Sequence, residues 1–330
     1  MRAVVVGSGL AGVTVAEALA KDPHNDVRLV TTEPHGYYSR PRLSHGFAMS
    51  EEAAAKIVMK RFEALAPVRV LSGTEVAAID RDRRHAVLDS GDHLAYDVLI
   101  LAMGSAASIP PVLVPSRPHF LTLNSFDDLL TLRRRRAKVL ARGAKPRWAV
   151  IGGGLIGCEA ASDLHKAGDA VTIFHREPRL LELQLDAEQS QMLHHHFASR
   201  GVELRYNQSV QGVLSSSVVT AAGEAGPFDG VIVSTGFAPR VELAKYAGLA
   251  TGRGIKVDAY LRTGDPRIYA VGDVAEIDSR LFPFVSPIRS QGLWLAEHLA
   301  QRTEAPWTPA PFSPIIKIHE FKLQARPAPA

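Results

Sequence analysis

Two stretches of this sequence carry the same spacing of three glycines, and the chemistry that this spacing serves is the binding of phosphate groups. In each stretch the first glycine permits a tight turn after a strand, the second lets a pyrophosphate approach the backbone, and the third lets the next helix pack on the strand. A helix that begins there directs free N–H groups at the phosphates. The glycines are Gly7, Gly9 and Gly12, and then Gly152, Gly154 and Gly157.

The first glycine cluster is flanked by the elements that such a site needs. Ala3–Val6 is a short apolar run that predicts a buried parallel strand, and a helical pattern follows Gly12. A second strand, Val27–Thr31, ends near Glu33, about 20 residues after Gly12, where a carboxylate meets the ribose hydroxyls of a dinucleotide. We therefore expect a dinucleotide here. The alternative is a glycine-rich turn that binds nothing.

The second glycine cluster repeats this arrangement. An apolar strand leads into it, a helical pattern follows, and the next predicted strand is Ala170–Phe174. That strand ends at His175, Arg176 and Glu177. His175 and Arg176 can meet a 2′-phosphate, whereas Glu177 can reach an unphosphorylated ribose. The pattern favours NADPH slightly over NADH and leaves both open.

Three further strands are predicted, and the first of them ends in small residues, which allow a flat ligand to approach the backbone closely. They are Tyr96–Leu101, which precedes Gly104; Asp229–Ser234, which precedes Gly236; and Ile268–Val271, which precedes Gly272 and Asp273. The stretch Glu51–Leu65 has a helical pattern.

The composition bounds the class of protein. The chain has 330 residues, of which 46 % are hydrophobic and 22 % charged, as in a soluble globular protein of two or three domains. Its net charge of +4 is mild, and no nucleic-acid-binding motif is present. No apolar run approaches the roughly 18–20 residues of a membrane span, and a strand that begins almost at Met1 leaves no room for a signal peptide. We expect a cytoplasmic enzyme.

The single cysteine, Cys158, excludes an internal disulfide and any mechanism that passes electrons through a pair of thiols. It stands inside the second glycine motif, and we interpret it as a small buried residue rather than a reactive thiol.

Two clusters of like residues lie on predicted helices. Arg133–Arg136 belong to the helical stretch Asn124–Ala141 and form either a solvated basic surface or a docking site for an acidic redox protein. His194–His196 lie on the helix Asp186–Ser199. Because adjacent helical side chains point about 100° apart, we expect surface histidines rather than a metal site.

Taken together, the motifs GSGLAG, TTEPHGYYSRPRLS, ILAMGS, IGGGLIGCEAA, STGFAPR and RTGDPRIYAVGD, in this order, resemble the FAD-dependent pyridine nucleotide-disulfide oxidoreductases, in particular bacterial rubredoxin–NAD(+) reductases. The resemblance implies an α/β fold with two Rossmann-like dinucleotide-binding domains of three layers (ββα), the NAD(P) domain being inserted into the FAD domain. The expected FAD domain comprises residues 1–110 and 228–303, and the NAD(P) domain residues 111–227. Residues 304–330 stand as a short tail where the family has a third domain.

The resemblance also assigns roles to residues. Glu33 would bind the FAD ribose, Val76 would contact the adenine, Asp273 would hold the ribitol chain, and Glu159 would face the flavin and nicotinamide. The expected cofactor-binding residues are Gly7, Ser8, Gly9, Leu10, Ala11, Gly12, Glu33, Arg40, Val76, Gly104, Gly152, Gly154, Leu155, Ile156, Gly157, Glu159, His175, Arg176, Gly236, Gly272, Asp273, Val285 and Lys317.

Three residues are the candidates for chemistry: Glu159, His45 and Lys317. Related ferredoxin reductases often carry a lysine where this chain has His45, so that His45 either tunes the flavin or fills space. Lys317 matches a family lysine near the flavin. Either of these two could stabilise negative charge on the reduced flavin.

The resemblance implies an enzyme that takes a hydride from NADH or NADPH and passes single electrons through FAD to a small acidic iron protein, most simply rubredoxin. Alternatives are a ferredoxin reductase, an NAD(P)H oxidase or diaphorase, and, in a different class, a flavin-binding remnant or subunit without activity. The sequence leaves open whether the chain forms a homodimer.

Overall fold

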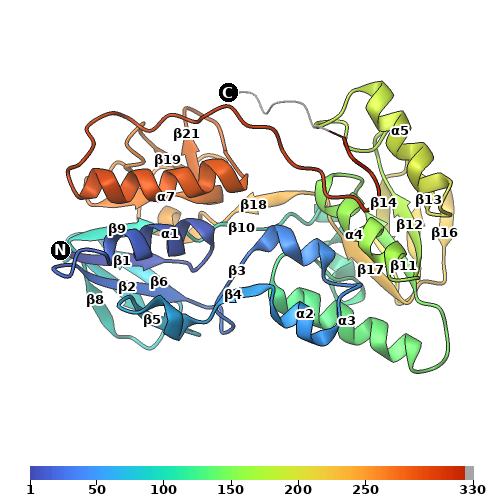
Figure 1. Ribbon diagram of the computed structural model, residues 1–330, viewed down its shortest axis with the longest axis horizontal. Helices are drawn as coiled ribbons and strands as arrows, with labels where there is room; N and C mark the ends of the chain where they lie inside the picture. The colour runs from blue at the N-terminus through green and yellow to red at the C-terminus, as the bar shows by residue number, and fades with distance from the viewer. Residues whose placement is uncertain (324–330) are drawn as a thin grey trace.

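The computed structural model of the protein describes residues 1–323. Its first domain is built on a parallel sheet in the order β20-β9-β1-β2-β5 (Figure 1). The strands are β1 (Arg2–Val6), β2 (Asp26–Thr31), β5 (Arg69–Ser72), β9 (Val98–Leu101) and β20 (Ile268–Ala270). The register pairs Ala3 with both Val27 and Val98. The central strands are apolar and buried, as expected for a parallel sheet covered on both faces.

One face of this sheet is covered by helices α1 (Leu10–Leu19) and α7 (Val285–Leu299), which pack against each other (Figure 1). The other face is covered by an antiparallel sheet of β6 (Val76–Asp80), β7 (His85–Leu88) and β8 (His93–Ala95), together with the short helix α6 (Glu242–Tyr246). A small parallel pair, β19 (Ile255–Val257) with β21 (Ala275–Ile277), lies beside them. Each face of the sheet has its own apolar core.

The second domain repeats this plan with a parallel sheet in the order β13-β12-β11-β17. Its strands are β11 (Arg147–Ile151), β12 (Ala170–Phe174), β13 (Glu203–Arg205) and β17 (Gly230–Val233). The helices α3 (Phe126–Leu140), α4 (Leu155–Lys166) and α5 (Ala187–Ala198) cover one face, and the meander β14 (Val210–Val213), β15 (Val218–Thr220) and β16 (Gly223–Ala225) covers the other. The expected α/β fold with two three-layer Rossmann-like domains is confirmed.

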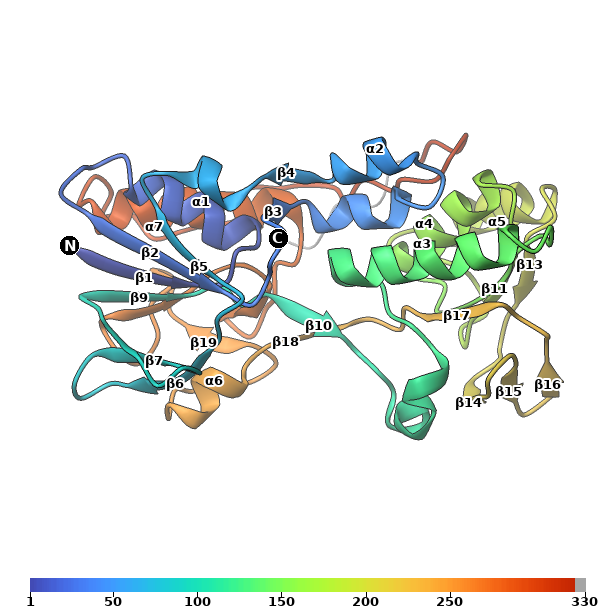
Figure 2. The ribbon, with the colours of Figure 1, turned by 90° about the horizontal axis from the view of Figure 1, so that it is seen from below.

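Two antiparallel linker strands, β10 (Ser105–Ala107) and β18 (Phe237–Pro239), connect the domains (Figure 2). After β10 a 3-10 helix, η3 (Pro111–His119), leads into the second domain. Because β17 pairs with β11 in the second sheet, the chain returns to the first domain at β18. We expected the return at residue 228, which is one strand too early because β17 still belongs to the second domain.

The stretch expected as one helix, Glu51–Leu65, is instead three short elements. Helix α2 (Glu51–Ala55) begins at a Ser50 cap, β4 (Val58–Lys60) pairs with β3 (Tyr37–Tyr38), and a 3-10 turn, η2 (Phe62–Leu65), follows. Before them lies another 3-10 helix, η1 (Arg40–His45). The prediction was wrong because tertiary pairing with β3 outweighs the helical pattern.

After α7 the chain crosses back over the molecule and reaches α4 in the second domain (Figure 1, dark red). We call residues 303–321 the strap. Ile316 and Ile318 of the strap are buried in the core of the second domain. In the part of the chain that the structure describes, no helix has the length and apolar character needed to cross a membrane.

Candidate dinucleotide and redox site

The first glycine cluster forms a cradle at the carboxyl end of β1. Gly7 has a φ of +106°, and a Cβ there would lie 2.4 Å from the Ala102 carbonyl oxygen. A Cβ at Gly12 would lie 1.9 Å from the Gly7 oxygen, so both positions require glycine. A Cβ at Gly9 would meet nothing within 4 Å. Gly9 is thus a glycine that the protein's own packing does not require, which fits a ligand lying against its backbone.

The helix that follows this cradle starts without a side-chain cap, so its first N–H groups are available to an anion. Ser8 lies beside it, with its Oγ 2.9 Å from the Thr31 Oγ1. At the end of β2, the Tyr38 hydroxyl donates to Glu33 Oε1 at 2.6 Å. Burial and the neighbouring Glu33 raise the pKa of Tyr38 well above its usual value, so the hydroxyl keeps its proton and holds this carboxylate at the strand end.

The opposite side of the first cradle is built by residues far along the chain. Ser105 Oγ donates to Asp273 Oδ2 at 2.7 Å, and Arg40 Nη1 donates to the Ser105 carbonyl oxygen at 3.1 Å. The Gly272 N–H donates to Gln291 Oε1 at 2.7 Å. Gln291 is fully buried, and its Nε2 has no protein partner among the described residues. An orphaned buried donor beside Gly272 fits a site that is completed by a polar ligand.

Sequence reasoning missed Gln291. The signal was available, because Gln291 is a polar residue on the face of the last helix that also carries Gly292, Leu295 and Ala296, all buried.

The three glycines of the second cradle make the same kinds of contact as those of the first. Gly152 has a φ of +112°, with a Cβ position 2.4 Å from the Ser234 carbonyl oxygen. A Cβ at Gly157 would lie 1.9 Å from the Gly152 oxygen, and one at Gly154 would meet nothing within 4 Å. Helix α4 begins at Leu155 without a side-chain cap, and Ile156 is exposed at its first turn. The same arrangement of glycines and uncapped helix N-terminus therefore occurs twice.

His175 is not free to bind a nucleotide phosphate, contrary to our expectation. Its side chain is buried. Its Nδ1 accepts from the Gly153 N–H at 3.0 Å, and its Nε2 donates to Glu182 Oε2 at 3.1 Å. A ring whose Nδ1 accepts a hydrogen bond is neutral. Through this hydrogen bond the His175 side chain stabilises the glycine loop. Arg176 is exposed and pairs with Glu177 at 2.8 Å.

Glu159 is buried one turn inside α4 and joins three segments of the chain. Ser44 Oγ donates to its Oε2 at 2.6 Å, and Lys317 Nζ lies 3.2 Å from the same oxygen. The Lys317 backbone N–H donates to Oε1 at 3.2 Å, and Lys317 Nζ also donates to the Pro41 carbonyl oxygen at 2.5 Å. The structure thus brings Glu159 and Lys317 together, as an ion pair linking the second domain, η1 and the strap.

His45, the third candidate for chemistry, belongs to the same cluster through Ser44, whose Oγ lies 3.2 Å from His45 Nδ1. Burial, reinforced by the positive charge of Lys317, lowers the pKa of His45. The imidazole is therefore neutral at neutral pH. Ser44 was not among the expected residues, although it stands directly before His45 in the sequence.

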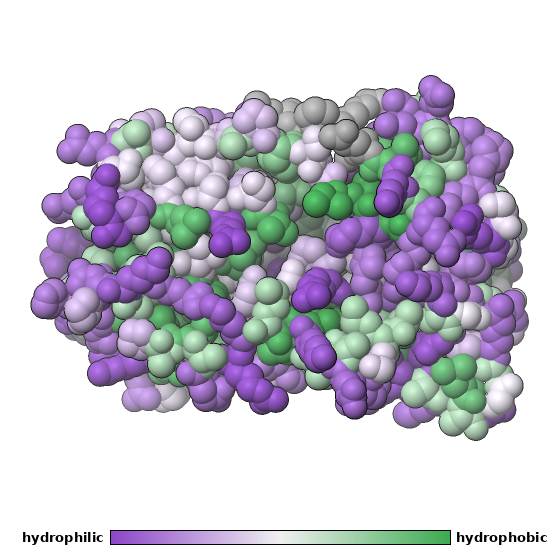
Figure 3. All heavy atoms as spheres, in the orientation of Figure 1, coloured by the Kyte–Doolittle hydropathy of each residue, from purple (hydrophilic) through white to green (hydrophobic). Residues whose placement is uncertain are grey.

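The remaining expected residues lie beside the linker strands and at the starts of β6 and α7. Gly104 and Gly236, with φ of +65° and +121°, stand beside the two linker strands. Val76 starts β6 and is buried, whereas Val285 starts α7 and is half exposed. Figure 3 shows apolar side chains gathered in the middle of this face of the molecule.

The arginine cluster on α3 is neither a solvated surface nor a free docking site as a whole. Arg133 binds the carbonyl oxygens of Gly46 and Met49 and pairs with Glu51. Arg136 pairs with the buried Asp169 at 2.8 Å. These two arginines fasten neighbouring segments of the protein to α3.

Other features of the sequence have structural explanations. Cys158 is buried, and burial raises the pKa of its thiol, in line with the prediction of a packing residue. His194 contacts the Tyr206 hydroxyl at 3.0 Å and His195 contacts Gln191 at 3.1 Å. No group of three potential metal ligands occurs within residues 1–323.

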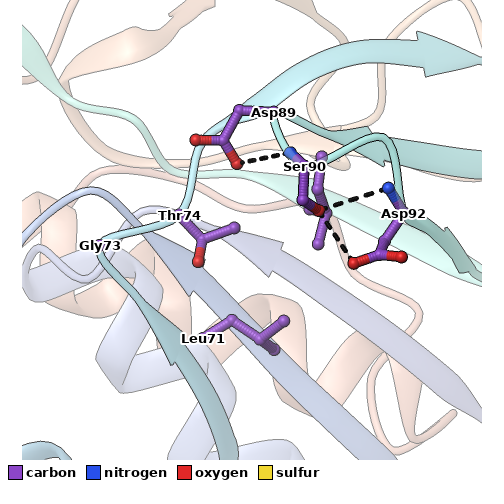
Figure 4. Close-up of a pocket in the computed structure, with 7 residues that line it drawn as sticks. Leu71, Gly73, Thr74, Asp89, Ser90 and Asp92 are labelled. Atoms are coloured by element: carbon purple, nitrogen blue, oxygen red, sulfur yellow. Dashed lines mark hydrogen bonds between the residues drawn. The ribbon is translucent and has the colours of Figure 1, made fainter.

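An open hollow of about 480 Å³ lies between the β5–β6 loop and the β7–β8 turn (Figure 4). Its polar lining comes from Thr74, Asp89, Ser90 and Asp92. None of the expected site residues lines it, so we assign it no function.

Comparison with known proteins supports the relationship that the motifs indicated. Residues 1–299 match the model of the pyridine nucleotide-disulphide oxidoreductase family. The chain is 35 % identical over 306 residues to the nitric oxide reductase FlRd-NAD(+) reductase of Salmonella gallinarum, with 90 % of this chain and 78 % of the relative covered. It is 34 % identical over 328 residues to the protein of the same name from Pectobacterium atrosepticum, with 97 % and 84 % covered.

Solved structures agree with this relationship. The covalent putidaredoxin reductase–putidaredoxin complex matches with a TM-score of 0.85 and 30 % identity over 97 % of this chain and 79 % of that one. The ferredoxin reductase of the CYP199A2 system from Rhodopseudomonas palustris matches with a TM-score of 0.85 and 29 % identity, covering 94 % and 79 %. With its two glycine cradles, the chain is an oxidoreductase and belongs to the pyridine nucleotide-disulphide oxidoreductase family.

Proposed function

We propose that this protein takes electrons from a pyridine nucleotide and passes them, through FAD held in the first cradle, to a small one-electron iron carrier of the rubredoxin type. The observation that carries the proposal is the pair of matching cradles, whose connecting cluster holds Glu159, Lys317 and His45. The names of the relatives, which are reductases of a flavorubredoxin, support this type of acceptor.

The residues divide the work by position. In the first cradle, the N-terminus of α1 would bind the FAD pyrophosphate and Glu33 would bind the ribose. Asp273 and Gln291 would bind the ribitol chain of FAD. Flavin supplies the chemistry that joins a two-electron donor to a one-electron acceptor. The protein's part is to hold the two nucleotides and to place the charges of Glu159 and Lys317, 3.2 Å apart, at the seam between them.

We propose NADH rather than NADPH as the donor, which reverses the slight preference that the sequence suggested. His175 is neutral and turned inward, so one of the two groups expected to meet a 2′-phosphate is removed. Arg176 is already paired with Glu177, whose carboxylate suits the two hydroxyls of an unphosphorylated ribose. We propose the cytoplasm as the compartment, because pyridine nucleotides are regenerated there.

The test begins with the colour of the purified protein. We expect flavin absorption bands, their bleaching by NADH under anaerobic conditions, and reduction of cytochrome c that depends on added rubredoxin. A colourless protein that FAD cannot reconstitute would contradict the proposal. Bleaching followed by cytochrome reduction that requires ferredoxin instead of rubredoxin would change the acceptor and leave the rest intact.

A further inference from the structure

A line of hydrogen bonds runs from the Glu159–Lys317 ion pair to the imidazole of His45. Lys317 Nζ lies 3.2 Å from Glu159 Oε2, Ser44 Oγ lies 2.6 Å from that oxygen, and His45 Nδ1 lies 3.2 Å from Ser44 Oγ. Glu159 and Ser44 are buried, whereas His45 is only partly so. The line therefore leads outward from a buried carboxylate to a ring near the surface.

The hydrogen-bond roles along this line decide which nitrogen of His45 is free. A carboxylate only accepts, so the single Ser44 hydroxyl proton goes to Glu159 at 2.6 Å rather than to the Pro41 oxygen at 3.4 Å. Ser44 Oγ must then accept from His45 Nδ1–H. The neutral ring consequently carries its proton on Nδ1, and its Nε2 lone pair makes no hydrogen bond to any residue that the structure describes.

The neighbouring histidine, His319, is fixed in the opposite state. Its Nε2 donates to Asp163 Oδ1 at 2.8 Å, while its Nδ1 faces Lys166 Nζ at 3.4 Å. Asp163 is itself held by the Phe47 N–H at 2.7 Å. Both ring nitrogens of His319 are occupied, and its ring packs edge-on against His45 with 5.2 Å between centroids. His319 thus orients the ring of His45 and leaves His45 Nε2 as the available base.

Both cradles lead to this cluster. The 3-10 helix that ends at His45 begins at Arg40, which binds the Ser105 carbonyl oxygen on the far wall of the first cradle. Glu159 lies four residues after Leu155, the first residue of α4, which is about 6 Å along the helix from the second cradle. His45 therefore belongs to the region where the two nucleotides of the proposed reaction would meet.

The proposed reaction must dispose of one proton in each cycle. NADH delivers a hydride, which is two electrons and one proton, and two ferric carriers each remove one electron. The products are NAD+, two ferrous carriers and one proton that stays behind. We propose that His45 Nε2 accepts this proton and releases it to water, with Ser44 and Glu159 fixing the tautomer that leaves Nε2 free. This inference rests on the proposed function.

The surrounding charges suit a base. Burial, Lys317 and His319 lower the pKa of His45, while Glu159 and Asp163 oppose that effect. The ring is thus neutral, and able to accept a proton, at pH values above this lowered pKa. When the pH falls below this pKa, His45 is already protonated before the reaction begins, and the step that depends on His45 slows.

The test compares His45→Gln with His195→Gln, a control at an exposed histidine on α5. The protein is first reduced anaerobically with NADH and then mixed rapidly with ferricyanide, a one-electron acceptor, in the presence of a pH-indicator dye. We expect bleaching by NADH to be unchanged in His195→Gln, and bleaching of His45→Gln provides the reduced protein for the second step. We expect proton release and reoxidation to slow about 100-fold in His45→Gln only. Added imidazole should restore the rate in His45→Ala.

A second readout needs no turnover. In protein labelled with ¹⁵N-histidine, we expect His45 to carry its proton on Nδ1, and Ser44→Ala to shift the ring towards the Nε2–H form. A proton on Nε2 in the unmodified protein would overturn the inference, as would an unchanged rate of proton release in His45→Gln. Failure of NADH to bleach the unmodified protein would instead contradict the proposed function.

Discussion

The two cradles are alike at the glycines and unlike at the ends of their second strands. In both, the first and third glycines are required by backbone contacts of 2.4 and 1.9 Å, and the middle glycine faces open space. At the end of β2, Glu33 is held by the Tyr38 hydroxyl. At the end of β12, the strand register places Glu177 at the position that corresponds to Glu33, and there it pairs with the exposed Arg176, while His175 turns inward to the glycine loop.

This difference separates two tasks. The glycine spacing predicts a site for a pyrophosphate, and the contacts of the glycines are the same in both domains. We expect the strand end to set which nucleotide is bound, because its side chains would face the ribose. The first cradle is moreover closed by Asp273 and Gln291 from the returning part of the chain, which suits a cofactor that stays bound.

The largest effect on stability is expected where an added methyl group would overlap with a backbone carbonyl oxygen. Gly12→Ala and Gly157→Ala each place a Cβ 1.9 Å from a carbonyl oxygen, and we expect each to lower the free energy of unfolding by about 3 kcal/mol. Urea unfolding measures this. Gly264→Ala is the matched control, since a Cβ there meets nothing within 4 Å. Equal stability of Gly12→Ala and Gly264→Ala would contradict the close packing of strand and helix.

The middle glycines should separate binding from folding. Because Gly9 and Gly154 have open space at the Cβ position, we expect alanine at either to change the free energy of unfolding by less than about 0.5 kcal/mol. Gly9→Ala should weaken FAD binding and Gly154→Ala should weaken NADH binding, each by about tenfold or more. Fluorescence titration gives both affinities. A variant that binds its nucleotide normally would show that the ligand does not approach that backbone.

The strand end gives the smallest effect. Glu177→Gln removes the carboxylate proposed to bind the ribose of NADH, and we expect the affinity for NADH to fall about tenfold while that for NADPH changes little. Glu188→Gln, at an exposed position on α5, is the control. Stopped-flow reduction at a series of NADH and NADPH concentrations measures both affinities. A variant that still prefers NADH by the same factor would place the selection elsewhere.

The sequence by itself determined the two cradles. A glycine with positive φ and a glycine under a helix can be predicted from spacing alone, because the contacts that require them lie within one strand–turn–helix unit or its neighbouring strand. Glu33 and the buried strands followed from the same local pattern. Cys158 could likewise be interpreted correctly from its place in the motif.

Only the tertiary structure decided what side chains do when their partners lie far away in the sequence. His175 follows its strand as a nucleotide-binding residue would, yet its neighbours Gly153 and Glu182 turn it inward. Arg133 has the sequence pattern of a surface arginine, but its guanidinium donates hydrogen bonds to two carbonyl oxygens of the 46–49 loop. Glu159 meets Ser44 of η1 and Lys317 of the strap only because folding brings these distant segments to α4. Local spacing encodes backbone geometry, whereas the state of a polar side chain is set by whichever partner folding brings within hydrogen-bond distance.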